Sequence, residues 1–141
     1  MAVSKAKSVW NGTLKEGKGT MGFTGYEGPF TFATRFENAK GTNPEELVGA
    51  AQSGCYSMFL SALISGEGLN PESIETTATV TLGDLDGGPA ITNIKLETVV
   101  KCAGLSQEKF KELAETAKVK CPISRLYAGG TANIELDAKL V

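Results

Sequence analysis

Hydrophobic and polar residues alternate along three short stretches in the first third of the chain. They are Ala6 to Asn11, Thr13 to Gly17 and Phe30 to Phe36, and an Asn-Gly turn signal separates the first two. A period of two is typical of half-buried strands, because successive side chains of a strand point to opposite faces. We therefore predict that a sheet starts here.

A longer apolar segment follows and predicts a central helix. Asn43 is a favourable N-cap residue, Pro44 fits the first helical position because it has no N–H to leave unpaired, and Glu46 stands at capping-box spacing. The helix should run to about Ser65. Its second half, Tyr56 to Ile64, is apolar on most faces, so we expect it to be buried on several sides.

The rest of the chain predicts a hairpin, a second helix and a last strand. Ile74 to Leu82 and Ile91 to Cys102 alternate and flank a glycine- and aspartate-rich turn, which is typical of an antiparallel hairpin. Ser106 is the expected cap of an amphipathic helix that ends near Cys121, and Thr131 to Leu140 reads as a final strand. The apolar face of that helix consists of Phe110, Leu113, Ala114 and Ala117. The predicted fold class is α+β, with mainly antiparallel sheets, a buried central helix and a second, amphipathic helix.

Composition narrows the range of functions. The 141 residues, 41% of them hydrophobic, suit one domain, residues 1–141, with a core. The net charge of −2 comes from interspersed charges, which excludes a footprint for nucleic acid or an anionic membrane. A membrane span needs about 20 unbroken apolar residues, and five residues interrupt the central helix: Gln52, Ser53, Gly54, Ser57 and Ser61.

The absence of histidine bears on the chemistry. Without it, no Ser-His-Asp or Cys-His pair and no histidine-rich zinc site can form. The start of the chain, Met1 to Lys5, has no apolar signal-peptide region, so we expect a reducing cytoplasm rather than structural disulfides. The three cysteines lack a CxxC spacing, which argues against zinc and against a thioredoxin-type motif. We expect no metal and no bound cofactor.

Two of the three cysteines are candidates for chemistry. Cys55 lies in the middle of the central helix after small residues that give access, although a free cysteine is most often a small buried hydrophobe. Cys121 precedes Pro122, which ends one helix and allows another short turn to begin, so backbone N–H groups would lie near the sulfur; the alternative is a helix-end cysteine without a role. Cys102 continues the apolar face of a strand and is expected in the core.

Two charged residues complete the set of candidates. Arg35 is one of only two arginines, and its planar guanidinium can bind a carboxylate while it faces a thiolate or a peroxide oxygen; the alternative is a solvated strand end. Glu45 stands in the first turn of the central helix, where a carboxylate also favours the helix dipole without any further role.

These residues and their order resemble the OsmC/Ohr family, the osmotically inducible and organic-hydroperoxide-resistance thiol peroxidases. The resemblance covers nearly the whole chain, and Thr34-Arg-Phe-Glu is closer to the OsmC branch. The matching segments are Trp10-Asn-Gly, Lys18-Gly-Thr, Lys40-Gly-Thr-Asn-Pro-Glu-Glu-Leu, Gly49-Ala-Ala, Cys55, Thr76-Thr and Lys120-Cys-Pro-Ile-Ser. Within the resemblance, Cys55 matches the peroxidatic cysteine, Cys121 the resolving cysteine, Arg35 the activating arginine and Glu45 its carboxylate partner.

The resemblance implies a mechanism and an intertwined dimer. Arg35, held by Glu45, keeps Cys55 as thiolate; the thiolate attacks an organic hydroperoxide, or hydrogen peroxide, and becomes sulfenic acid. Cys121 then forms a disulfide with Cys55, which an external dithiol reduces. Two other functions stay open: a non-catalytic redox-sensing or stress-related binding module on the same fold, and a structural dimer with buried cysteines.

Helix geometry independently favours a homodimer. Glu45 precedes Cys55 by ten residues, which on one helix is about 15 Å of rise and a rotation about 80° short of three turns. Either the helix begins later than Pro44 and the chain bends back, or Glu45 serves the cysteine of a partner subunit. The apolar second half of the helix favours the partner.

Overall fold

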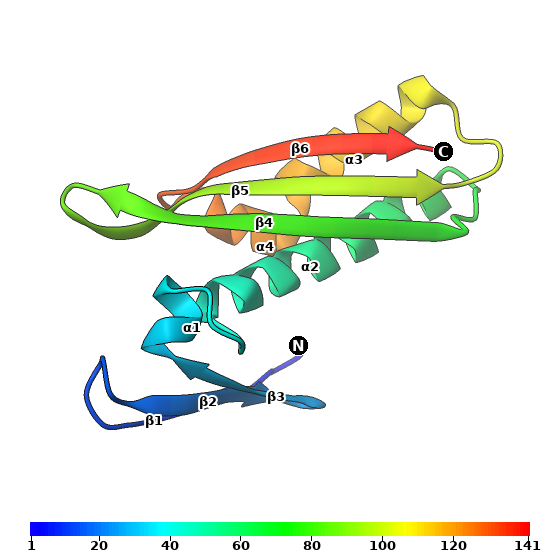
Figure 1. Ribbon diagram of the computed structural model, residues 1–141. Helices are drawn as coiled ribbons and strands as arrows, with labels where there is room; N and C mark the ends of the chain where they lie inside the picture. Colours follow the sequence, from blue (N-terminus) through cyan, green and yellow to red (C-terminus); the bar gives the residue numbers. More distant parts are fainter. The chain divides into compact units, whose positions relative to one another are not determined.

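The structure, a computed structural model, describes all residues from 1 to 141 and divides them into two units, Met1–Glu46 and Leu47–Val141. The first unit contains one sheet and a short helix, and the second contains another sheet and the packed helices (Figure 1). Each unit is described separately below.

The first unit is built on an antiparallel sheet of three strands in the order β1-β2-β3. The strands are β1 (Ala6–Asn11), β2 (Lys18–Phe23) and β3 (Tyr26–Thr31). The first strand has the predicted bounds. The predicted strand from Thr13 to Gly17 is wrong: these residues form the turn between β1 and β2, and the Gly17 N–H donates to the Thr13 carbonyl at 2.8 Å.

The second half of the predicted strand Phe30–Phe36 is also wrong, because a helix begins inside it. Helix α1 (Phe32–Phe36) follows β3 directly and is capped by Thr31. The Thr34 N–H donates to the Thr31 hydroxyl at 3.2 Å, and the Thr31 N–H donates to the Thr34 hydroxyl at 2.9 Å. This reciprocal capping box satisfies donors that an extended chain would leave to a neighbouring strand, and it outweighs the alternating pattern.

The second unit contains a three-stranded sheet in the order β4-β5-β6. β4 (Ser73–Leu85) and β5 (Gly88–Lys101) form the predicted antiparallel hairpin, and its two turn residues, Asp86 and Gly87, have φ values of 54° and 81°. Two consecutive positive φ values are typical of a type I′ turn. β6 (Asn133–Leu140) starts two residues later than predicted and pairs with β5 in parallel, which is the one parallel pairing of the fold.

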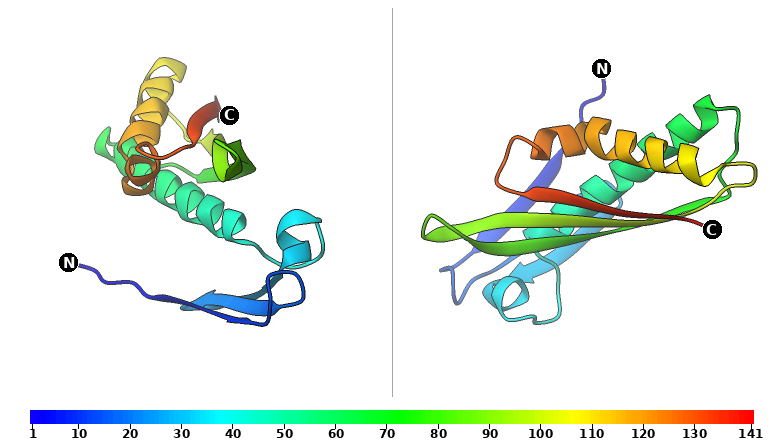
Figure 2. Two further views of the ribbon diagram at one scale, coloured as in Figure 1. Left: turned by 90° about the vertical axis from the view of Figure 1, so that its left-hand side faces the viewer. Right: turned by 90° about the horizontal axis from the view of Figure 1, so that it is seen from above.

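Three helices belong largely to this unit: α2 (Pro44–Gly66), α3 (Gln107–Lys120) and α4 (Pro122–Tyr127). α2 and α3 lie on the same face of the β4-β5-β6 sheet (Figures 1 and 2). Ser106 caps α3 through the Lys109 N–H, as predicted. The predicted apolar face of α3 is buried along its length: Phe110, Leu113, Ala114 and Ala117.

Helix α2 begins at Pro44, as the sequence predicts, so the alternative of a later start is wrong. The Glu46 N–H donates to Asn43 Oδ1 at 2.8 Å, which confirms the N-cap. The reciprocal half of the predicted capping box is not made, because the Glu46 carboxylate instead accepts a hydrogen bond from the Thr42 hydroxyl at 2.9 Å.

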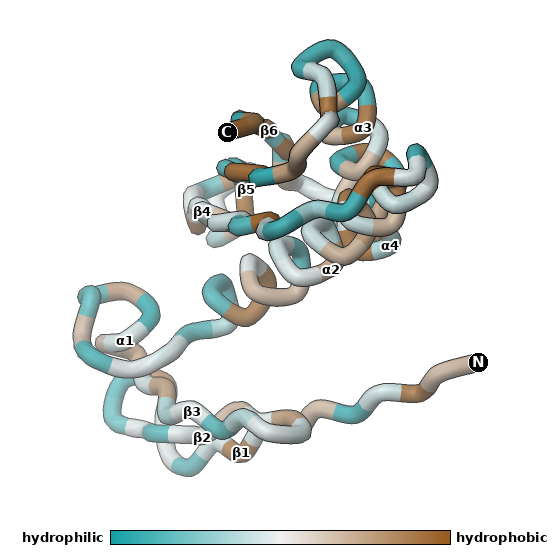
Figure 3. The backbone as a smooth tube through the Cα atoms, turned by 90° about the vertical axis from the view of Figure 1, so that its right-hand side faces the viewer, coloured by the Kyte–Doolittle hydropathy of each residue, from teal (hydrophilic) through white to brown (hydrophobic).

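Only one face of α2 is buried within a single chain. Tyr56, Leu60 and Ile64, spaced four residues apart, are fully buried in the core of the second unit, whereas Met58 is 77% exposed. The expectation of burial on several sides is therefore wrong for one chain by itself. Figure 3 shows that this helix is nevertheless coloured mostly white to brown after its first turn.

By length and composition alone, α2 is apolar enough to cross a membrane. The buried face of α2 belongs to the same hydrophobic core as the sheet and α3. The strand face predicted to continue to Cys102 is confirmed: Ile94, Leu96 and Val100 are at most 1% exposed, and Cys102 is buried just after β5.

Candidate functional site

The Arg35 and Glu45 side chains form a two-pronged ion pair in the first unit. Arg35 Nη2 donates to Glu45 Oε1 at 2.6 Å, and Arg35 Nε lies 3.1 Å from Oε1 and 3.2 Å from Oε2. Such fork-to-fork contacts fix the orientation of a guanidinium as well as its position. Glu45 is buried, while about a third of the Arg35 side chain stays exposed. The pair therefore leaves one side of a fixed cation open.

Short-range structure explains this pairing. Arg35 stands in the last turn of α1 and Glu45 in the first turn of α2, and the seven-residue connection between those helices brings the two side chains together. The capped start of α1 and the capped start of α2 fix both ends of the connection. The alternative of Arg35 as a solvated strand end is wrong, because the residue is helical and paired.

The structure brings Cys55 and Cys121 together in the second unit. Burial raises the pKa of the Cys55 thiol; a hydrogen bond from the backbone N–H of Ile123 lowers it, and the Cys121 thiol beside it raises it again, through a hydrogen bond and through charge. All three cysteines are free. A half-exposed thiol next to a buried one is the arrangement that an oxidisable cysteine pair requires.

Small residues before Cys55 have two different roles. Gly49 is buried, and a Cβ atom there would lie 3.2 Å from Val80 Cγ2 and 3.3 Å from the Ala78 carbonyl, so this glycine allows α2 to approach β4. Gly54, in contrast, has nothing within 4 Å of a Cβ position. The helix surface is therefore open at Gly54, next to Cys55, whereas at Gly49 the space is filled by Val80 and Ala78 of β4.

Cys121 lies at a helix break, as predicted. It is both the C-cap of α3 and the N-cap of α4, and its Sγ accepts a hydrogen bond from the Ser124 N–H at 3.3 Å. Its backbone is extended, with φ −62° and ψ 138°, because a residue before proline is disfavoured in the helical region. The backbone N–H groups of Ile123 and Ser124 thus face the two sulfur atoms.

A buried polar pair that sequence reasoning missed lies beside the two cysteines. Gln52 Nε2 donates to the Ser124 hydroxyl at 3.1 Å, and the Cys121 thiol donates to the same hydroxyl at 3.0 Å. Gln52, Ser124 and Cys121 are at most 1% exposed. A signal for this pair exists in the sequence: Ser124 is three residues after a helix-capping cysteine, and Gln52 interrupts the apolar stripe that continues at Tyr56.

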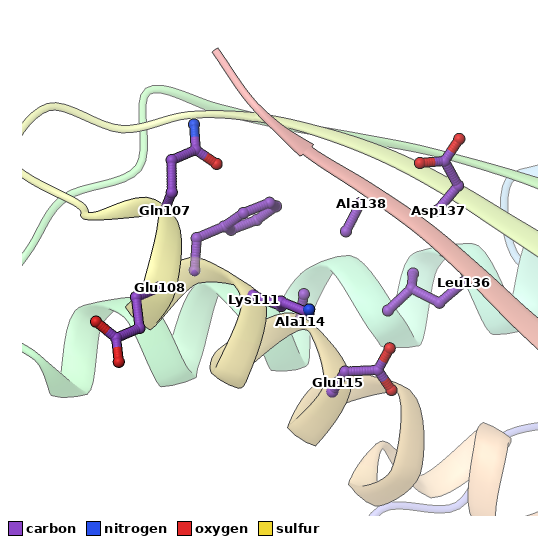
Figure 4. A pocket seen from close by; sticks show the side chains of 9 residues that line it. Gln107, Glu108, Lys111, Ala114, Glu115, Leu136, Asp137 and Ala138 are labelled. Atoms are coloured by element: carbon purple, nitrogen blue, oxygen red, sulfur yellow. The ribbon is translucent and has the colours of Figure 1, made fainter.

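Neither cysteine lines the groove between α3 and β6. This groove encloses about 420 Å³ and carries three carboxylates and one lysine on its rim over an apolar floor (Figure 4). The lining residues are Gln107, Glu108, Phe110, Lys111, Ala114, Glu115, Leu136, Asp137 and Ala138. No three carboxylate or thiol groups gather anywhere as a set of metal ligands. The groove is therefore separate from the thiol pair.

Comparison with known proteins agrees with this arrangement. The model of the OsmC-like protein family matches residues 37–137. Peroxiredoxin OsmC of Escherichia coli is 42% identical over 139 residues, which span 96% of this chain and 95% of that protein. The organic hydroperoxide resistance protein OhrB of Bacillus subtilis is 30% identical over 122 residues, 82% of this chain and 87% of that protein.

The fold is also found among solved structures. The crystal structure of an OsmC-like protein from Mycoplasma pneumoniae superposes with a TM-score of 0.78 at 17% identity and covers 99% of this chain and 98% of that one. The similarity over most of the chain to Peroxiredoxin OsmC and to OhrB identifies a thiol-dependent peroxidase. The chain belongs to the OsmC family.

Proposed function

We propose that this thiol peroxidase reduces organic hydroperoxides through a sulfenic acid at Cys55 and a disulfide between Cys55 and Cys121. The observation that supports the proposal most directly is the meeting of the two thiols, one half-exposed and one buried. The similarity to OhrB, a protein named for organic hydroperoxide resistance, supports the substrate class. Hydrogen peroxide is a second, smaller substrate for the same chemistry.

The bonds made and broken in the reaction involve only the two thiols, the peroxide and a reductant. The Cys55 thiolate attacks one peroxide oxygen; an S–O bond forms, the O–O bond breaks, and the alkoxide takes a proton and leaves as alcohol. The Cys121 thiol then attacks the Cys55 sulfur; the S–S bond forms, the S–O bond breaks, and hydroxide leaves with the thiol proton as water. An external dithiol reduces the disulfide and restores both thiols.

Cys55 needs a cation to react at neutral pH. Burial raises the pKa of its thiol, so without a nearby positive charge only a small fraction is thiolate. Arg35 is a suitable cation because Glu45 fixes it and one side of it stays exposed. Ten helical residues, about 15 Å of axial rise, separate Glu45 from Cys55, so we assign the Arg35–Glu45 pair to the Cys55 of the partner subunit in a homodimer.

Two exposed surfaces support a homodimer. On α2, the exposed residues at helical spacing are apolar or small: Ala51, Gly54, Met58 and Ala62. The β1-β2-β3 sheet has no buried apolar residue of its own, since the hydrophobic core lies entirely after residue 46. A three-stranded sheet needs an apolar covering for stability, and a second copy supplies one. We accordingly treat residues 1–141 as one domain that is completed in the dimer, in the reducing cytoplasm.

Peroxide consumption with excess dithiol tests the activity. We expect multiple turnovers with cumene hydroperoxide or tert-butyl hydroperoxide in the wild-type protein and none in Cys55→Ser. A wild-type protein whose thiols oxidise once and do not turn over with dithiol would instead be a redox-sensing module. Turnover that persists in Cys55→Ser would contradict the proposal.

The dimer has a separate test. Met58→Lys places a charge on the exposed stripe of α2, where it costs a single chain little because the side chain is 77% exposed. We expect light scattering to report a dimer for the wild type and a shift toward the monomer mass for Met58→Lys. Val119→Lys, at a 63% exposed position of α3, is the matched control and should stay dimeric. A wild-type protein at the monomer mass contradicts the assignment.

A further inference from the structure

The buried side chains of Gln52 and Ser124 form a second link between α2 and α4, next to the link made by the cysteines. Gln52 precedes Cys55 by three residues on α2, and Ser124 follows Cys121 by three residues at the start of α4. Residues three apart on a helix lie on the same side. The Gln52–Ser124 hydrogen bond of 3.1 Å therefore runs alongside the approach of the two sulfur atoms.

Ser124 makes two hydrogen bonds with the Cys121 thiol, one through its side chain and one through its backbone. Its hydroxyl accepts from the Cys121 thiol at 3.0 Å, and its backbone N–H donates to the same sulfur at 3.3 Å. Gln52 donates a second hydrogen bond to that hydroxyl and so fixes its acceptor side. Because all three residues are fully buried, no solvent competes with these bonds. The thiol is held in one orientation.

Stability alone does not account for Gln52. Its Oε1 atom is buried and has no hydrogen-bond partner. Such an orphaned acceptor destabilises the folded state, and an apolar residue of similar volume avoids that cost. The position continues the fully buried apolar stripe of Tyr56, Leu60 and Ile64, where an apolar side chain fits the surroundings. The amide at this position is therefore explained by the hydrogen bond that its N–H group donates to the Ser124 hydroxyl.

We propose that Gln52 and Ser124 are positioning residues for the resolving half of the reaction: they hold the Cys121 thiol toward Cys55, and the Ser124 hydroxyl carries the thiol proton away as the disulfide forms. In this step the Cys121 and Cys55 sulfurs join, the S–O bond of the Cys55 sulfenic acid breaks, and the thiol proton passes by way of the Ser124 hydroxyl to the departing hydroxide, giving water. The inference rests on the proposed function, since it assigns Cys121 the resolving role.

A single-turnover experiment separates the two halves of the reaction. Reduced protein without dithiol is mixed with one equivalent of cumene hydroperoxide. Peroxide loss reports the oxidation of Cys55, dimedone trapping with mass spectrometry reports the sulfenic acid, and the loss of free thiols reports the disulfide. If the wild-type protein consumes no peroxide, the proposed function fails at its first step. The present inference is tested only by the second step.

The variants are chosen to distinguish positioning from packing. Ser124→Ala and Gln52→Met should oxidise Cys55 at the wild-type rate but form the disulfide about tenfold more slowly, the effect of losing one hydrogen bond of about 1.4 kcal/mol. Dimedone-trapped sulfenic acid should accumulate in both. Ser124→Thr keeps the hydroxyl and should restore most of the rate. Ser57→Ala removes a hydroxyl of the same helix that bonds Thr76 instead, and should change neither step.

Thermal unfolding gives an independent measurement on the same proteins. Gln52→Met removes the orphaned acceptor, so we expect its Tm to equal or exceed that of the wild type while its disulfide forms slowly. A folded Ser124→Ala or Gln52→Met protein that forms the disulfide at the wild-type rate overturns the inference. Slow disulfide formation in Ser124→Thr with an unchanged Tm also overturns it, because the hydroxyl would then not be the group that matters.

Discussion

The Arg35–Glu45 ion pair allows a prediction with an internal control. Glu45→Gln keeps the shape of the side chain and removes its charge. Glu46→Gln removes the same charge one residue later, in the same first turn of α2, where the carboxylate accepts a hydrogen bond from Thr42 and does not touch Arg35. Both variants lose the favourable interaction of a carboxylate with the helix N-terminus, so the difference between them reports the contact with Arg35.

The magnitude follows from geometry and exposure. The helix-terminus effect is about 0.3–1 kcal/mol and applies to both variants. Hydrogen bonds to charged groups contribute about 1.5–3 kcal/mol when shielded, but about a third of the Arg35 side chain is exposed, so solvent screening reduces the figure to about 1 kcal/mol. Glu45→Gln should therefore lower the free energy of unfolding by about 1 kcal/mol more than Glu46→Gln, which corresponds to a Tm difference of about 3–4 °C.

The functional difference should be larger than the difference in stability. Without its carboxylate partner, the Arg35 guanidinium is free to rotate, and a cation that must face the reacting sulfur loses its fixed position. We expect kcat/KM for cumene hydroperoxide, measured with excess dithiol, to fall about 10- to 100-fold in Glu45→Gln and less than twofold in Glu46→Gln. Equal kcat/KM and equal unfolding free energies in the two variants would refute this account of the pair.

Other predictions address the cysteines, a buried tyrosine and the cap of α1. Cys121→Ser should consume one peroxide per chain and stop at a dimedone-reactive sulfenic acid on Cys55, and full turnover in this variant with no other thiol present would argue against the resolving role. Cys102→Ala removes the thiol in the core, away from the pair. This variant should keep turning over and lose about 1–2 kcal/mol of unfolding free energy. Burial raises the pKa of the Tyr56 phenol, so the folded state keeps the proton while the unfolded chain ionises near pH 10. The free energy of unfolding should therefore fall as the pH rises above that value, and urea titrations should show a smaller fall in Tyr56→Phe. This variant also loses the hydrogen bond to the Ala114 carbonyl. An equal alkaline loss in both proteins would contradict this origin. Thr31→Ala removes one half of the α1 capping box and should lower the free energy of unfolding by about 1 kcal/mol. It should also lower kcat/KM, because α1 carries Arg35. An unchanged kcat/KM would show that the cap does not contribute to the site.

Local signals in the sequence predicted the second unit better than the first. The hairpin, the cap of α3 and the buried face of α3 all depend on residues close in sequence, and they are confirmed. Phe30 to Phe36 was ambiguous, because alternation indicates a strand while Thr31 and Thr34 at capping-box spacing indicate a helix start. The shorter-range hydrogen bonds decided the outcome. The parallel pairing of β6 with β5 depends on contacts about 40 residues apart, which local patterns do not encode.

For the candidate site, residue types could be predicted but their joint geometry could not. Arg35, Glu45, Cys55 and Cys121 stand out because each is chemically unusual in its context. Gln52 and Ser124 are ordinary residues by type, and their importance depends on a hydrogen bond between positions 72 residues apart. The break that Gln52 makes in the apolar stripe marks a buried polar position, but it does not identify Ser124 as the partner. Burial of α2 was overestimated for a related reason, since apolar residues occur on several of its faces while the fully buried apolar stripe is that of Tyr56, Leu60 and Ile64.

The helix break at Pro122 connects the fold to the chemistry. If α3 continued past Cys121, the backbone N–H groups of the next residues would be used within the helix, and neither Ile123 nor Ser124 would have one to direct at a sulfur. Proline prevents this by holding the preceding residue in an extended conformation, so the end of one helix and the start of the next share Cys121 as their cap. The first turn of α4 then provides a backbone donor for each thiol and a hydroxyl acceptor for the Cys121 proton. A turn required by the covalent chemistry of proline therefore creates the polar surroundings of the buried Cys121 thiol.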